Sequence, residues 1–326
     1  MKNLALLTLL ILTANSYAKV WRLGIVDSQN KEPYTTIRKH FISSLNQRGL
    51  SSGQNLEIKK YSIGNQVGAF KNIWKYYLKD KIDFLYVSGT IATIGAKKYI
   101  KDSTIPVVFA APTDPIGIGV INNFKEGNKQ FTGICYPVKV EHRLDFLLKL
   151  FPETKNIGII YSDMPQSHSY NKWLKQTIKR PKYKGISLHF RKVQFIKSER
   201  GQERMASLAK VEVKKIDHMV DIYLAPNDQM GTQSPFAKQV SSITNKPLIG
   251  IAIKDINEGW GSTAVISPSL KDIGSKAALM IKKLTMGIRV KEITPLWPKE
   301  EIMISKSKMK KHEAKTPKNY IRYLVE

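Results

Sequence analysis

Short apolar runs alternate with helix-period segments along nearly the whole chain, and this alternation limits the possible folds more than any other feature. Several runs, such as residues 84–87 and 157–161, are continuously apolar, which is typical of strands buried on both faces of a parallel sheet. Apolar residues recur at helical spacing over 144–151 and 273–284, which indicates amphipathic helices. The pattern predicts an α/β protein with doubly wound parallel sheets. The expected strands are residues 20–26, 84–87, 105–110, 157–161, 186–193, 219–224, 248–251, 263–266 and 301–304.

The strand–helix rhythm occurs twice, over residues 20–135 and again over 155–252, and residues 133–140 lie between the two sets. A chain of 326 residues also exceeds what one compact core usually needs. We therefore expect two α/β lobes that enclose a cleft. Ligands of such sheets bind at the carboxyl ends of the strands.

The first 18 residues have the layout of a secretory signal peptide. Lys2 precedes an apolar run over residues 4–12, and Ser16-Tyr17-Ala18 supplies small residues for cleavage after Ala18. The run is shorter than the roughly 20 apolar residues that a transmembrane helix needs. Cys135 is the only cysteine, so no cysteine lies at the cleavage point to carry a lipid anchor. The sequence thus predicts a periplasmic protein without a lipid anchor.

The chain is strongly basic, with 53 Lys and Arg against 26 Asp and Glu, a formal net charge of +27. Such a charge is typical of nucleic-acid-binding proteins, but an exported protein does not normally come into contact with chromosomal DNA. A repressor would also need an N-terminal helix-turn-helix, and the signal segment leaves no room for one before Val20. We expect no nucleic-acid partner. Two interpretations stay open for the lysines, which are densest over residues 306–315: a solvated surface, or peripheral contact with anionic lipid headgroups or an acidic partner.

The strand over residues 84–87 is followed by Ser88, Gly89 and Thr90, and a helix is expected to start directly after them. Ser and Thr at a helix start cap free backbone N–H groups. The same position, with a glycine that allows close backbone approach, can hold a carboxylate or phosphate. The residues alone do not decide between these two roles.

Three further expected strands also end in small polar or acidic residues. Thr113 and Asp114 follow one strand, and Asp114, next to Pro115, can accept a ligand hydrogen bond or only organise its turn. Ser162 follows a second strand, and Asn227 with Asp228 follows a third. Four expected strands, distributed over both expected lobes, therefore end in polar residues. This distribution favours a binding cleft between the lobes. Aromatic residues in or beside the neighbouring loops can add an apolar wall or only pack; these are Tyr34, Tyr136, Tyr161 and Trp260.

Sequence signatures of catalysis are missing: we find no Walker loop, no nucleophile elbow and no zincin helix. The six histidines are scattered, and Cys135 has no evident histidine partner, so we interpret it as a small buried hydrophobe. We therefore expect no catalytic residues, no metal site and no cofactor.

Several segments occur in an order that resembles the ABC transporter substrate-binding family that includes the bacterial tryptophan- and tyrosine-binding proteins. They are Ser88-Gly89-Thr90-Ile91-Ala92-Thr93, Ile105-Pro106-Val107-Val108-Phe109-Ala110, Thr113-Asp114-Pro115-Ile116-Gly117, Phe131-Thr132-Gly133, Asn156-Ile157-Gly158-Ile159-Ile160-Tyr161, Asn227-Asp228, Ile249-Gly250 and Asp272-Ile273-Gly274. The resemblance covers nearly the whole mature chain. It implies a type I periplasmic-binding-protein fold, with lobe 1 over 19–135 plus 262–290 and lobe 2 over 137–260 plus 297–326. The chain would cross between the lobes near 133–140, 259–263 and 295–298.

The resemblance also implies how the site works. Ser88 and Thr90 would hold a ligand carboxylate, with Gly89, Thr113 and Asp114 nearby. Tyr136, Ser162, Asn227 and Asp228 would complete the cleft. One departure concerns the acidic residue that many relatives carry just after the strand at 248–251: here Ala252 and Ile253 follow, and the next acid is Asp255. This departure weakens any transfer of amino-acid specificity, because a ligand ammonium in a closed cleft needs an anionic or strong acceptor partner.

We expect an exported solute-binding protein of an ABC-type uptake system that closes its two lobes over a small polar or carboxylate-bearing ligand, with an aromatic amino acid as one candidate. Its partner would be an ABC permease, and the protein itself a monomer. Two alternatives stay open. The same fold can act as a ligand sensor that feeds a membrane kinase or cyclase, and an exported enzyme with an unrecognised site is the second alternative.

Overall fold

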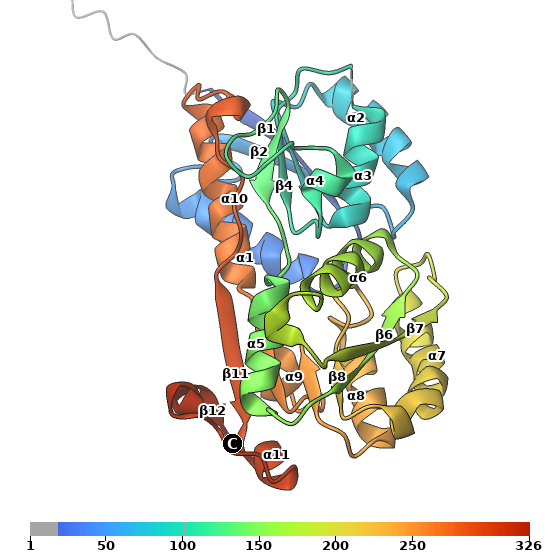
Figure 1. Ribbon diagram of the computed structural model, residues 1–326. Coiled ribbons are helices and arrows are strands. Elements are labelled where there is room, and N and C mark those ends of the chain that lie inside the picture. The colour runs from blue at the N-terminus through green and yellow to red at the C-terminus, as the bar shows by residue number, and fades with distance from the viewer. Residues whose placement is uncertain (1–18, 101) are drawn as a thin grey trace, which may run out of the picture.

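The computed structural model describes residues 19–100 and 102–326, which form two α/β lobes, one above the other in Figure 1. The expected signal peptide, residues 1–18, lies outside the described residues. Within the described ranges, no helix is both long enough and apolar enough to cross a membrane.

The first lobe is a parallel sheet of five strands in the order β2-β1-β3-β4-β5, flanked by helices. Its strands are β1 (Trp21–Asp27), β2 (Leu56–Ser62), β3 (Phe84–Ser88), β4 (Val107–Ala110) and β5 (Phe131–Ile134). Its helices are α1 (Tyr34–Gln47), α2 (Phe70–Asp80), α3 (Thr90–Tyr99), α4 (Pro115–Ile118) and, from much later in the chain, α10 (Leu270–Thr285).

Both faces of this sheet are covered, which explains why its central strands are continuously apolar. Successive side chains of a strand point to opposite faces. Tyr86 and Val108 accordingly join a core with residues of α1 and α10, whereas Leu85 and Val87 join a separate core with residues of α2 and α3. All four side chains are fully buried.

The second lobe is a mixed sheet of seven strands in the order β12-β11-β10-β9-β8-β6-β7. Its strands are β6 (Asn156–Ser162), β7 (Ser187–Val193), β8 (Ile222–Leu224), β9 (Leu248–Gly250), β10 (Ala264–Pro268), β11 (Glu300–Ser305) and β12 (Leu324–Val325). Its helices are α5 (Val140–Leu150), α6 (Pro165–Thr177), α7 (Gly201–Ile216), α8 (Ser234–Ile243), α9 (Lys254–Asn257) and α11 (Lys306–Lys311). Short 3-10 helices cover Val67–Ala69, Pro181–Tyr183, Asp217–Met219, Val290–Glu292 and Lys318–Tyr323.

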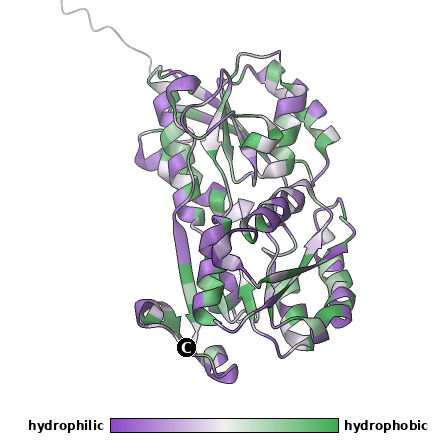
Figure 2. Cartoon of the chain, viewed as in Figure 1, coloured by the Kyte–Doolittle hydropathy of each residue, from purple (hydrophilic) through white to green (hydrophobic). Residues whose placement is uncertain are grey.

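The second sheet is also covered on both faces. Ile157 and Ile159 of β6 pack with α5 and α6, and Tyr223 and Leu248 belong to the core that includes α7 and α8. In Figure 2, β6 is coloured mainly as hydrophobic, while the surrounding helices mix hydrophobic with hydrophilic residues. The α/β fold with two parallel-sheet lobes, predicted from the sequence, is therefore confirmed.

Three chain segments pass between the lobes, after β5, after β10 and before β11. The first and third run side by side, because Leu296 N donates to Gly133 O at 2.9 Å and Cys135 N donates to Leu296 O at 3.1 Å. The second and third meet where Ser269 N donates to Lys299 O at 2.8 Å. Such adjacent crossings can act together as a hinge between two rigid bodies.

The second crossing lies elsewhere than the sequence indicated. We expected it near residues 259–263 and assigned 262–290 to the first lobe. In the structure β10 pairs in parallel with β9 and antiparallel with β11, so residues 264–268 belong to the second sheet. The chain returns to the first lobe only after Pro268, because the strand–helix rhythm reveals a strand but not the sheet that it joins.

Some strands also differ from the expected ones. β2 and β5 were not expected as strands, and the expected strand at 219–224 is shortened to β8 because Asp217–Met219 forms a 3-10 helix. β11, expected at 301–304, is confirmed as a strand, but it runs antiparallel to β10. Cys135 is fully buried and unpaired, as its interpretation as a small hydrophobe requires, and burial raises the pKa of its thiol well above the ordinary value.

Candidate functional site

A cavity of about 20 Å³ lies between the lobes, at the carboxyl ends of both sheets. This volume holds about one water molecule. The cavity is lined by Pro33, Tyr34, Thr90, Ala111, Thr113, Tyr136, Gln166, Asn227, Asp228, Gln229 and Thr232. The structure therefore brings together six residues that the sequence singled out, namely Tyr34, Thr90, Thr113, Tyr136, Asn227 and Asp228.

The start of α3 forms the first-lobe wall of this cleft. Ser28 caps the helix, since its hydroxyl accepts from Ala92 N at 3.0 Å and donates to Ser88 O at 2.9 Å. The Ser88 hydroxyl is buried and has no hydrogen-bond partner among the described residues. The capping role considered for Ser88 is thus taken by Ser28, and Ser88 itself does not line the cavity.

Gly89 gives this wall its shape. Its φ is +89°, a conformation that side chains rarely adopt. A Cβ at this position would lie 2.5 Å from Ser28 Oγ and 2.6 Å from Tyr34 Cε1. Glycine is therefore required both by the backbone turn and by the close approach of Tyr34.

Thr90 and Thr113 are joined, whereas Asp114 points elsewhere. Thr113 N donates to Thr90 Oγ1 at 3.1 Å, which ties the start of α3 to the loop after β4. Asp114 caps the short helix α4, because Gly117 N donates to its Oδ1 at 2.7 Å. Of the two roles considered for Asp114, the structure shows the turn-organising one; its side chain is outside the central cavity and lines the adjoining hollow of about 450 Å³.

In the second lobe Asp228 organises the loop after β8. Its carboxylate accepts from Ser162 N at 2.9 Å, Ser167 Oγ at 2.8 Å and Gly231 N at 2.9 Å. Burial raises the pKa of Asp228 above the ordinary value, and these hydrogen bonds oppose that rise. The Ser162 hydroxyl is itself buried without a partner among the described residues. Asp228 therefore positions the backbone at the second-lobe side of the cleft.

Polar side chains from the two lobes bind each other directly across the cleft. Asn227 Nδ2 donates to Thr113 Oγ1 at 3.0 Å. Gln229 Nε2 donates to Tyr34 Oη at 2.9 Å and to Asn65 Oδ1 at 2.8 Å. Burial raises the pKa of Tyr34 to about 12, so its phenol stays protonated at neutral pH. The described lobes are thus closed on one another through groups that a ligand could also use.

A second set of interlobe contacts lies in the loop between β7 and α7. Glu199 Oε2 accepts from Asn30 N at 2.9 Å, and its Oε1 accepts from Ser62 Oγ at 2.5 Å. In the same loop, Ser198 O accepts from Gln29 Nε2 at 2.7 Å. This loop therefore binds the second lobe to the first through hydrogen bonds beside the cleft.

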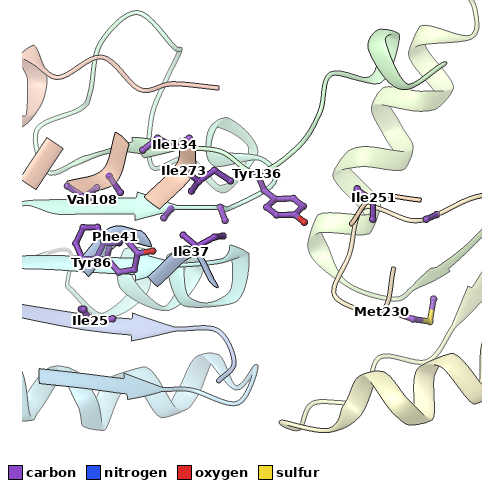
Figure 3. Packing of buried hydrophobic residues seen from close by; sticks show 14 of the residues in the cluster. Ile25, Ile37, Phe41, Tyr86, Val108, Ile134, Tyr136, Met230, Ile251 and Ile273 are labelled. Carbon is purple, nitrogen blue, oxygen red and sulfur yellow. The ribbon is translucent and has the colours of Figure 1, made fainter. Parts of the chain in front are cut away.

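Tyr136 stands between the lobes. Figure 3 shows its ring beyond the first-lobe cluster around Ile134 and Ile273, on the side of Ile251 and Met230 of the second lobe. Tyr34 and Tyr136 both line the cavity, whereas Tyr161 packs against His168 and Phe190, and Trp260 lies in the core. Two of the four aromatic residues suggested by the sequence thus reach the cleft.

The narrow cavity has a wider hollow on either side. One, of about 450 Å³, shares Thr90 and Gln166 with it, and the other, of about 270 Å³, shares Pro33, Tyr136 and Thr232. The interlobe space is therefore a groove that is narrowest where the polar residues meet.

Sequence reasoning missed Asn65, Gln166, Gln229 and Thr232. Gln229 directly follows the predicted Asn227-Asp228 pair, and Gln166 follows the strand end at Ser162, so a longer window at each strand end would have included both. Asn65 offered no such signal, because it follows β2, which was not expected as a strand.

The cleft presents hydroxyl, amide and phenol groups. Among residues 19–100 and 102–326, no three His, Cys, Asp or Glu side chains gather in a way that could hold a metal ion. The arrangement suits hydrogen bonding to a small polar molecule enclosed between two lobes. The fold and the position of the cleft define a solute-binding protein of the type I periplasmic-binding kind.

The chain belongs to the family described as "ABC transporter substrate binding protein", whose profile matches residues 25–323. It is 24% identical over 279 residues to the tyrosine-binding protein of Clostridioides difficile, covering 84% of this chain and 75% of that protein.

Solved structures share the fold. A conserved domain protein from Vibrio cholerae matches with a TM-score of 0.80 and 18% identity, covering 94% of this chain and 99% of that one. An ABC domain from Streptococcus pneumoniae in complex with L-Trp matches with a TM-score of 0.77 and 18% identity, covering 94% of this chain and all of that one (100%).

Proposed function

We propose that this chain is the exported receptor of an ABC-type uptake system and that it binds an amino acid with an aromatic side chain in the interlobe cleft. The observation that carries the proposal is the meeting of polar strand ends from both sheets at one cavity. Ser88 Oγ, Ser162 Oγ, Gln166 Oε1 and Asn227 Oδ1 are all buried there or beside it without a partner among the described residues. Buried polar groups are normally hydrogen-bonded, so unpartnered ones at a cleft are candidates for ligand contacts.

Relatives support this ligand class, because one is a tyrosine-binding protein and another was solved with L-Trp. The rings of Tyr34 and Tyr136 at the cavity can pack against an aromatic ligand.

Binding requires the lobes to part. Small-molecule pockets usually measure about 300–1,000 Å³, whereas the closed cavity measures about 20 Å³. We propose that opening breaks the Asn227–Thr113 and Gln229–Tyr34 hydrogen bonds, and that the ligand takes their place before the lobes close again. The closed, loaded form would then dock on a membrane permease. No chemical conversion is proposed.

Export and surface contact are further parts of the proposal. Removal of residues 1–18 takes away only Lys2 and leaves a formal charge of +26 from the original +27. The densest basic group lies around α11 in the second lobe, at the end far from the first lobe (Figure 1). We propose that this basic end approaches the anionic headgroups of the membrane that carries the permease.

A thermal-shift screen of the mature protein tests the ligand class. Amino acids, nucleosides, sugars and organic acids are each added in excess. A ligand present at 100 times its dissociation constant stabilises a protein by about 2.7 kcal/mol. We expect L-tryptophan or L-tyrosine to give the largest shift. Turnover of a hit would overturn the proposal, as would a screen in which no member of the panel stabilises the protein.

The Ser88→Ala variant tests the place of binding, because the Ser88 hydroxyl lies at the end of β3, beside the cavity residue Thr90. We expect about 10-fold weaker binding of the hit. Ser207→Ala on the exposed side of α7 is the matched control and should bind like the wild type. Equal affinity in both variants would remove Ser88 from the site.

A further inference from the structure

The hollow of about 270 Å³ beside the narrow cavity contains a carboxylate oxygen that the fold leaves without a partner. This oxygen is Oε2 of Glu32, in the loop that follows the carboxyl end of β1. Part of the Glu32 side chain is exposed, but Oε2 itself is buried and has no hydrogen-bond partner among the described residues. Buried polar atoms are normally hydrogen-bonded, so Oε2 needs a specific explanation.

The rest of Glu32 is held from both lobes. Thr36 Oγ1 on α1 donates to Oε1 at 2.8 Å, and Lys254 Nζ on α9 lies 3.5 Å from the same oxygen. Gln233 Nε2 of the second lobe donates to the backbone carbonyl of Glu32. Lys254 is half exposed, so solvent screens its charge. These contacts fix the carboxylate in the closed arrangement and leave Oε2 available as an acceptor.

The hollow combines apolar walls with polar groups from both lobes. Tyr136, Ile251 and Leu270 supply apolar surface, and Figure 3 shows the first two beside the interlobe space. Ser267 of β10 adds a hydroxyl that is buried without a partner among the described residues. Tyr136 also lines the narrow cavity, and burial together with the charge of Glu32 raises the pKa of its phenol. The hollow therefore continues the cleft and brings the charge of Glu32 close to it.

The other acidic residues around the interlobe space are engaged, exposed or closed off. Asp228 lines the cavity, but both of its oxygens accept hydrogen bonds from the loop that it organises. Asp114 caps α4, and Glu301 is exposed to solvent. Asp255 is fully buried and lines neither the cavity nor the two hollows beside it. Glu32 is therefore the acid best placed to meet a ligand.

We infer that Glu32 binds the ammonium group of the ligand and that the hollow beside Tyr136 is an amine subsite of the cleft. This inference rests on the proposed solute-binding function and sharpens it to ligands that carry a primary amine. A carboxylate and an ammonium form a strong, charge-assisted hydrogen bond, and the ring of Tyr136 in the same hollow can stabilise the cation further. Solutes of similar shape without the amine leave Oε2 unpaired and bind less tightly.

The test compares ligands with and without the amine. Calorimetric titrations use L-tryptophan and tryptamine, which carry it, and indole-3-propanoate, which lacks it. Glu32→Gln removes the charge and keeps the shape. We expect it to weaken binding of both amines by about 10- to 100-fold and to leave the weaker binding of indole-3-propanoate unchanged.

Glu258→Gln is the matched control. Glu258 is exposed, and its Oε1 also lies 3.5 Å from Lys254 Nζ, so this variant removes the other carboxylate beside the same lysine without changing the hollow. We expect it to bind all three ligands like the wild type.

Glu32→Asp covers the case in which urea unfolding shows that the Gln variant does not fold. It keeps the charge but draws the carboxylate back by one methylene, and we expect about 10-fold weaker binding of the amines with indole-3-propanoate again unchanged. Unchanged binding of the amines in Glu32→Gln, or an equal loss for all three ligands, would overturn the inference. A wild-type protein that binds indole-3-propanoate as tightly as L-tryptophan would overturn it too, while the solute-binding function stands. If the wild type binds none of these ligands, the proposed function fails as well.

Discussion

At the scale of single residues, Asp255 has the clearest consequence for stability. Its carboxyl is fully buried, and Ser262 Oγ donates to its Oδ2 at 2.9 Å, while Oδ1 has no partner among the described residues. Burial raises its pKa to about 7, from an ordinary value of about 3.9 in an unfolded chain. Between these two pH values the folded protein binds more protons than the unfolded one.

This proton excess fixes the sign of the pH dependence. The free energy of unfolding falls as pH rises from about 4 to about 7 and then levels off, as far as Asp255 contributes. Because one pKa unit corresponds to about 1.4 kcal/mol, the contribution is on the order of a few kcal/mol. We predict that Asp255→Asn shows a smaller loss of stability between pH 5 and pH 8 than the wild type. Urea unfolding at both pH values measures the difference.

Part of the slope should remain in that variant, because burial also raises the pKa of Asp228. If the wild type and Asp255→Asn lose equal stability between pH 5 and pH 8, the assigned protonation of Asp255 is wrong.

Gly89 provides a second prediction at this scale. Gly89→Ala strains a φ of +89° and also forces Cβ against Ser28 and Tyr34, so we expect a loss of about 2–4 kcal/mol. Gly185→Ala is the matched control: its φ is +91°, and nothing lies within 4 Å of its Cβ position. We expect the control to lose about 1–2 kcal/mol. Chemical denaturation measures both, and equal losses would mean that the close contacts at Gly89 carry no energy.

At the scale of elements, the loop between β7 and α7 controls how firmly the lobes close. The two hydrogen bonds of Glu199 to Asn30 and Ser62 join the two lobes, so they stabilise the closed arrangement relative to an open one. We predict that Glu199→Ala weakens ligand binding by about 3- to 10-fold. Glu203→Ala, on the exposed face of α7, should leave affinity unchanged. Calorimetric titration measures the affinity of both variants. An unchanged affinity in Glu199→Ala would show that the two hydrogen bonds of Glu199 do not contribute to closure.

The elements also show what the sequence could and could not predict. Continuous apolar runs identified β3, β4 and β6 because these strands are buried on both faces. β2 was not predicted as a strand, because it lies at the edge of the sheet and its apolar pattern is interrupted by Lys59 and Lys60. Residues 264–268 were assigned to the wrong lobe, since pairing with β9 depends on residues far away in the chain.

The candidate site was predictable to a similar extent. Polar residues directly after strands, such as Thr113 and Asn227, do meet at the cavity. The capping of α3 by Ser28 was not predictable, because Ser28 precedes the helix by more than 60 residues.

At the scale of the whole molecule, the basic surface has a testable partner. We predict that the mature protein binds vesicles containing phosphatidylglycerol more strongly than neutral ones, and that added salt weakens this binding. Lys310→Gln with Lys315→Gln should reduce vesicle affinity by about 30-fold, at about 1 kcal/mol per lysine. The pair Lys71→Gln with Lys75→Gln on α2 is the control. If both pairs of substitutions reduce vesicle affinity equally, the lysines around α11 form no specific membrane contact and only solvate the surface.

The central claim is that a solute is bound between the two lobes by polar groups from both. Calorimetric titration of the mature protein with L-tryptophan and L-tyrosine, repeated on the double variant Thr113→Val with Asn227→Ala, tests it most directly. These two residues come from opposite lobes and hydrogen-bond across the cleft. The account predicts one binding site per chain in the wild type and at least about 10-fold weaker binding in the double variant. Binding of unchanged affinity in the double variant, or no binding of any amino acid by the wild type, would contradict it.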